Sequence, residues 1–60
     1  MKELAKKILY AVYQPETDEN IEIVTEVLSS ESTMKDTDIC DALGIERRWN
    51  RAQIRRVLSN

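Results

Sequence analysis

The chain has 60 residues, of which 33% are charged and 42% are hydrophobic, and its formal net charge is −2. A chain this short forms at most one domain, and such a domain buries only about 60% of the surface that its unfolded form exposes. One cysteine and no histidine leave little material for disulfides or metal sites, and no apolar run approaches the roughly 20 residues that cross a bilayer. We therefore expect a single soluble, cytoplasmic domain over residues 1–60, without a membrane partner.

The first predicted element is a helix over residues 2–13. Apolar residues recur at helical spacing from Leu4 to Val12, with charged residues on the opposite side. Pro15 ends this helix, because the residue before a proline is pushed out of the α region. Tyr10 and Tyr13 lie near its end, and the sequence leaves open whether they belong to the edge of the core or to a partner surface.

The second predicted element is a helix over residues 19–29, after a polar connector. Its apolar residues from Ile21 to Leu28 again keep helical spacing. The many β-branched residues are also typical of a strand. Strict alternation fails at Ile23 and Val24, so we predict a helix.

The third predicted helix is short and covers residues 37–43. Asp36 or Thr37 is expected to cap its first amides. Gly44 follows as the residue that adopts a left-handed conformation without strain, and Ile45 behind it can fold back onto the helix, as the Schellman motif requires. The sequence therefore predicts a sharp turn at Gly44.

The fourth predicted helix covers residues 51–59, with Asn50 as its N-cap and a buried stripe of Ile54, Val57 and Leu58. Trp49 just before the cap is expected to act as a hydrophobic staple. The alternative for this residue is stacking on an exposed base.

Together the last two helices have the order of a helix-turn-helix over residues 36–59. Ile39, Ala42 and Leu43 are predicted to seat the first helix of the pair, and the small Cys40 lets the second cross closely over it. We expect an all-α, four-helix domain that is related to the winged helix but lacks the wing.

The charge is distributed unevenly along this fold. Residues 1–45 hold 4 Lys and 10 Asp or Glu, for a net −6, whereas residues 46–60 hold 5 Arg and one Glu, for a net +4. Arginine presents a planar fork of donors that matches phosphate oxygens and the guanine edge. Helical spacing from Ile54 puts Ala52 and Arg56 on the outer side, flanked by Gln53 and Arg55. The predicted DNA-contacting residues are Arg47, Arg48, Arg51, Ala52, Gln53, Arg55 and Arg56, with Arg47 and Arg48 placed in the turn to hold phosphates.

Two other functions use the same fold. The acidic sides of the first two helices, or the arginines of the fourth, are also suited to docking a partner protein without nucleic-acid contact, and the arginines can serve a purely structural role. No phosphate loop, nucleophile triad or carboxylate pair is present, so we expect neither catalysis nor a cofactor. Asp36, Asp38 and Asp41 lack the calcium-loop pattern, so no metal site is predicted, and these acids are expected to complement the positive end of the third helix.

Residues 36–58 resemble the C-terminal tail of primase-helicase replication proteins encoded by phages, plasmids and genomic islands, including the virulence-associated-protein-E-like group. The resemblance is carried by DICDALGI (residues 38–45), RWNRAQ (48–53) and RRVL (55–58). It implies an accessory module that engages DNA beside other domains, which hold the ATPase and primase activities. Such tails continue into a Leu-Gly-Trp strand that has no counterpart after Leu58, which is why no wing is expected. Neither the target sequence nor a preference for duplex or single strands follows from it.

Overall fold

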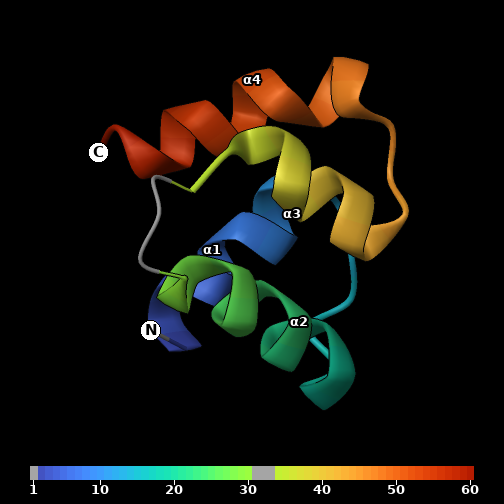
Figure 1. Ribbon diagram of the computed structural model, residues 1–60, viewed down its shortest axis with the longest axis vertical. Coiled ribbons are helices and arrows are strands. Elements are labelled where there is room, and N and C mark those ends of the chain that lie inside the picture. The colour runs from blue at the N-terminus through green and yellow to red at the C-terminus, as the bar shows by residue number, and fades with distance from the viewer. Residues whose placement is uncertain (1, 31–33) are drawn as a thin grey trace.

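The computed structural model describes residues 2–30 and 34–60 and consists of four helices, with no strand among those residues. The helices are α1 (Lys2–Ala11), α2 (Asp18–Ser29), α3 (Asp36–Leu43) and α4 (Arg47–Leu58) (Figure 1). This confirms the predicted all-α class. None of the described helices is long and apolar enough to cross a membrane.

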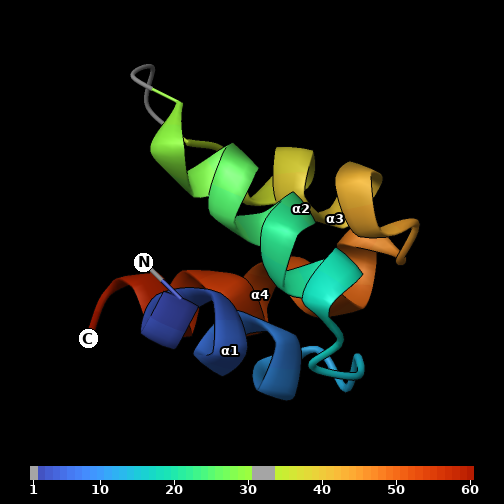
Figure 2. The ribbon, with the colours of Figure 1, turned by 90° about the horizontal axis from the view of Figure 1, so that it is seen from below.

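The helices are arranged as two layers of two. α1 lies beside α4 in one layer, α2 lies beside α3 in the other, and the layers meet where α1 contacts α2 and α3 contacts α4 (Figure 2). Each helix therefore packs against two others around a common centre. This arrangement leaves the outer side of α4 uncovered.

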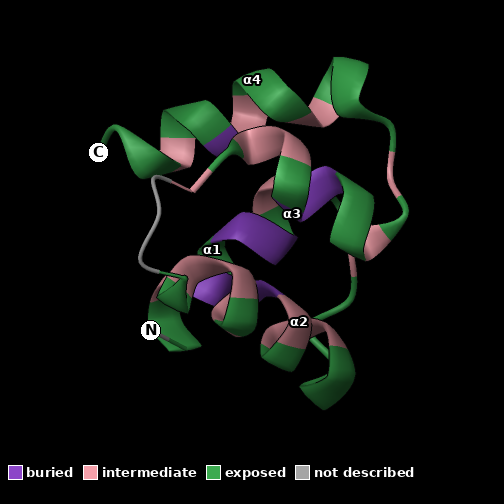
Figure 3. Cartoon of the chain, viewed as in Figure 1, coloured by how far each residue is buried: buried purple, intermediate pink, exposed green. Residues whose placement is uncertain are grey.

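The core is built from all four helices. Its buried side chains are Ala5, Ile8, Leu9, Val12, Val24, Ile39, Cys40 and Ile54 (Figure 3). The predicted role of Cys40 as a small core residue is confirmed, and burial raises the pKa of its thiol. Ala42 and Leu58 were expected in the core, and this was wrong: Ala42 lies opposite Cys40 on α3, and Leu58 is the last residue of α4 and is 37% exposed.

The end of α3 forms the predicted Schellman motif. Gly44 has a φ of 68°, its N–H donates to the Asp41 carbonyl at 3.2 Å, and the Ile45 N–H donates to the Cys40 carbonyl at 3.0 Å. The start of α3 differs from the prediction. Its N-cap is Lys35, which makes no side-chain capping bond, so neither Asp36 nor Thr37 caps the helix.

The end of α1 uses the same hydrogen-bond pattern without a glycine. The Tyr13 N–H donates to the Tyr10 carbonyl at 3.2 Å, and the Gln14 N–H donates to the Leu9 carbonyl at 2.9 Å. Tyr13 takes the left-handed position with a φ of 58°. Because the chain leaves the right-handed region there, the regular helix ends at Ala11, two residues earlier than predicted.

The start of α4 is the largest correction to the predicted elements. The helix begins at Arg47 rather than at residue 51, with the extended Glu46 as its N-cap. Asn50 was expected to be the cap, but it lies inside the helix, where its side-chain amide donates to the Glu46 carbonyl at 3.0 Å. None of residues 47–50 breaks a helix, so α4 begins at Arg47, directly after the extended residue Glu46. Arg47, Arg48 and Trp49 are consequently helical, not part of the turn.

Candidate nucleic-acid interface

The outer side of α4 carries the predicted contact residues on one continuous helix. Ile54 points into the core, and Ala52 and Arg56 lie almost diametrically opposite and are exposed. Figure 3 shows the outer side of α4 exposed along its length. Gln53 is only partly exposed. The surface is therefore open to a large partner, and its chemistry depends on which arginines are free.

Arg47 is held by Asp41 across the turn. Its Nε donates to Asp41 Oδ1 at 2.9 Å, and its Nη2 contacts Asp41 Oδ2. The hydrogen bond from Arg47 lowers the pKa of Asp41, and the same bond raises the pKa of Arg47. These two contacts hold α4 against α3, although the Arg47 side chain is still 54% exposed, so a phosphate would have to compete with Asp41 for it. Asp41 was expected to complement the positive end of α3, but the structure places it past the first turn and against Arg47.

Arg55 is partly compensated by Asp36 at the start of α3. Its Nε lies 3.4 Å from Asp36 Oδ2, without the geometry of a hydrogen bond. The Asp36 side chain is 12% exposed, whereas that of Arg55 is 72% exposed. The charge of Arg55 therefore offsets a nearly buried carboxylate, although most of its surface still faces solvent.

Three arginines of α4 remain uncompensated. Arg48, Arg51 and Arg56 are exposed, and no carboxylate of residues 2–30 and 34–60 lies within ion-pairing distance of them. Helical geometry spreads these three side chains over roughly 140°. Arg48 and Arg56 lie on the outer side with Ala52 between them, and Arg51 lies at its edge, about one turn before the buried Ile54. This arc of three positive charges around a small residue is the strongest polyanion-binding feature of the fold.

Two aromatic residues border the same region. A surface hollow of about 440 Å³ is lined by Val12, Tyr13, Ile45, Glu46, Trp49, Asn50 and Gln53. Tyr13 is 83% exposed and Trp49 is 69% exposed. The expected staple role of Trp49 is therefore wrong, because five residues before Ile54 the indole points well away from the buried side. Tyr10 is equally exposed but does not line this hollow.

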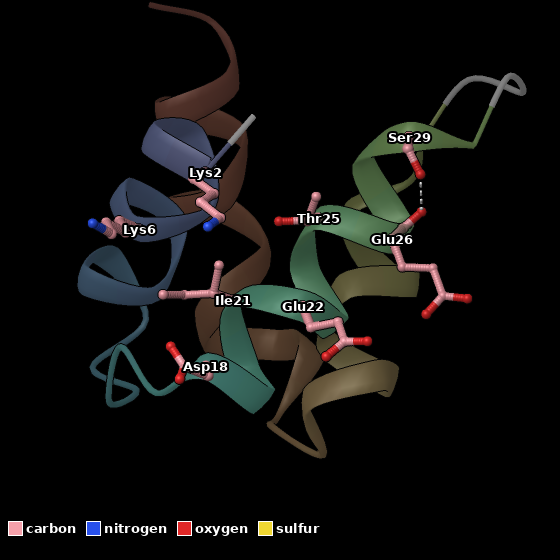
Figure 4. A pocket seen from close by; sticks show the side chains of 8 residues that line it. All are labelled: Lys2, Lys6, Asp18, Ile21, Glu22, Thr25, Glu26 and Ser29. Carbon is pink, nitrogen blue, oxygen red and sulfur yellow. Dashed lines mark hydrogen bonds between the residues drawn. The ribbon is translucent and has the colours of Figure 1, made fainter.

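A larger hollow of about 830 Å³ lies between α1 and α2. Its lining includes Lys2 and Lys6 of α1 and Asp18, Glu22 and Glu26 of α2 (Figure 4). The Thr25 hydroxyl points toward α1 and has no hydrogen-bond partner in the part of the chain that the structure describes. Three carboxylates against two ammonium groups make this groove unsuited to a polyanion, so the arginine-bearing side of α4 is the better candidate.

The chain matches no protein-family model, no curated protein and no solved structure. The likeness to replication-protein tails therefore rests on the sequence motifs of residues 36–58 alone.

The sequence did not reveal the left-handed position of Tyr13 at the end of α1. Pro15 was the available signal, because proline is common one or two residues after a left-handed helix end.

Proposed function

We propose that this chain is a non-catalytic DNA-binding helix-turn-helix module, an accessory domain of a replication protein of a phage, plasmid or genomic island. The observation that carries the proposal is the arc of uncompensated arginines, Arg48, Arg51 and Arg56, on the open side of α4. Arginines of this kind supply the phosphate contacts that dominate affinity for DNA. The resemblance of residues 36–58 to replication-protein tails supports the choice of parent protein.

The individual roles follow from the ion pairs. Arg48, Arg51 and Arg56 hold phosphates, Ala52 permits close approach, and Gln53 reaches toward base edges. Arg47 and Arg55 were predicted as direct contacts. We now assign them mainly to fixing α4 on α3, since each has a carboxylate partner there.

The proposal is tested by anisotropy titration of a labelled duplex over a range of salt concentrations. Three neutralised phosphates predict a slope of about −2.7 for log affinity against log salt, and a dissociation constant near 10⁻⁴–10⁻⁶ M. Arg48→Ala is expected to reduce the slope by about 0.9. Lys7→Ala is the matched control, because it removes one exposed positive charge from α1 and is expected to leave binding unchanged.

Protein docking is the second candidate function, and the hollow beside Tyr13 and Trp49 favours it, because exposed aromatic residues are enriched at protein interfaces. The same titration separates the two. If the duplex and a single strand both fail to bind at about 10 mM salt, where the screening length is about 30 Å, the arginines serve docking and the DNA proposal is rejected.

A further inference from the structure

We propose that Tyr13 and Trp49 form a stacking site for unpaired bases, so that the α4 surface binds single-stranded DNA in preference to duplex. This inference rests on the proposed function and names the form of DNA that the site takes. Three features of the described residues carry it: the backbone of Tyr13, the placement of Trp49 and the charges around their hollow.

Tyr13 occupies a strained backbone position that its own packing does not explain. A bulky residue in the left-handed region is unfavourable, and at the equivalent place after α3 the chain has Gly44. The Tyr13 side chain is 83% exposed, so it adds little to the core in return. Residues in strained backbone conformations cluster at functional sites. Here the left-handed conformation of Tyr13 sets the place and direction in which its aromatic ring projects from the end of α1.

Trp49 reaches the same hollow from α4. It is four residues before Gln53 and seven before Arg56, so helical geometry places the three side chains in one row along about 10 Å of the helix. The row offers an indole ring, an amide and a guanidinium group in that order. These are the groups that stack on a base, hydrogen-bond its edge and contact a phosphate.

The charges around the hollow determine how a strand would lie. Glu46 borders it, whereas Arg48 and Arg56 flank the outer side of Trp49 on α4. A phosphate backbone is therefore expected on the arginine side, with its bases turned over the hollow toward Tyr13. A single strand has groups for both parts of this surface, because its phosphates are suited to the arginine side and its flat bases to the aromatic side chains of the hollow.

The accessibility of base faces decides between single strand and duplex. In a duplex the faces are covered by neighbouring base pairs, so an aromatic side chain gains contact only by paying for unstacking. A single strand exposes the face of each base, and stacking on an aromatic side chain strengthens binding whatever the sequence. Two exposed aromatic residues on one hollow therefore add affinity for single strands specifically.

The test uses the tryptophan as a reporter, because Trp49 is the sole tryptophan of the chain. Titration with an unstructured single strand of about ten nucleotides is expected to quench its fluorescence. Trp49→Ala and Tyr13→Gly, measured by anisotropy, are each expected to weaken single-strand binding by about 5- to 150-fold and to change binding of a hairpin duplex by less than about twofold. Tyr13→Gly is also expected to raise the melting temperature, because glycine relieves the strain.

The control is Tyr10→Ala, which removes an equally exposed tyrosine outside the hollow and is expected to leave single-strand binding unchanged. Unchanged binding in both Tyr13→Gly and Trp49→Ala, with loss in Arg48→Ala, would overturn the stacking site and leave the DNA-binding proposal standing. Equal losses for single strand and duplex would overturn the strand preference. A wild-type chain that binds neither form would reject both proposals in favour of a protein partner.

Discussion

Arg47 and Arg56 have the same side chain but different surroundings. Asp41 contacts Nε and Nη2 of Arg47, whereas Arg56 has no carboxylate partner among residues 2–30 and 34–60. The sequence grouped five arginines by composition and could not separate them, because Asp36 and Asp41 become partners only when α3 packs on α4. Arg47 and Arg55, two of the predicted contact residues, therefore also hold α4 against α3.

The ion pair of Asp41 and Arg47 makes stability depend on pH. The pKa of Asp41 in the folded state lies below its ordinary value of 3.8, chiefly because Arg47 donates a hydrogen bond to it. The stabilisation is therefore fully present above pH 3.8 and is lost as the pH falls through the lowered pKa. Asp41→Asn is expected to lower the urea midpoint at neutral pH, with the difference from wild type disappearing under strong acid.

Glu16→Gln is the control for this measurement, since Glu16 is exposed and lies outside the helices. It is expected to leave the midpoint unchanged at neutral pH. If Asp41→Asn and Glu16→Gln behave alike across the acid range, the ion pair contributes nothing to stability, and Arg47 returns to the set of free phosphate contacts.

The helix ends differ in how far the sequence predicts them. The turn after α3 follows from Gly44, because its left-handed conformation is available to glycine without strain. The end of α1 and the start of α4 were misplaced, since Tyr13 adopts that conformation against its preference and Asn50 resembles a cap while lying inside a helix. Residue preferences therefore predict a helix end correctly only where the residue at that end adopts the conformation it prefers.

Substitutions of Gly44 isolate the backbone contribution at the turn. A Cβ added there meets no atom within 4 Å, so any loss of stability comes from the φ of 68° and not from a clash. Gly44→Ala is expected to destabilise by about 1 kcal/mol, and Gly44→Asn by less, because asparagine tolerates the left-handed region better. Chemical denaturation measures both. Equal losses for Ala and Asn would mean that the left-handed conformation is not the cause.

Assembly of the whole domain depends on a core that the apolar periodicity largely predicted. Apolar residues repeat at helical spacing within each segment, so the buried sides that hold Ile8, Val24, Ile39 and Ile54 can be found without knowing which helices pack against them. The hollow at Tyr13 and Trp49 joins the end of α1 to the first turn of α4. It exists only in the packed layers, which is why sequence reasoning treated those two residues separately.

The contribution of α4 to the fold is expected to be concentrated in Ile54, its one fully buried residue. A domain of this length has roughly 3–9 kcal/mol of stability. Ile54→Ala removes buried methyl groups and leaves a cavity between α4 and its neighbours, so it is expected to cost about 2–5 kcal/mol, a large part of that total. Leu58→Ala removes a similar side chain that is 37% exposed at the helix end, and it is expected to cost less than about 1 kcal/mol. Urea unfolding followed by circular dichroism measures both variants. Equal losses would mean that α4 packs in another register, and the arc of Arg48, Arg51 and Arg56 would then face a different direction.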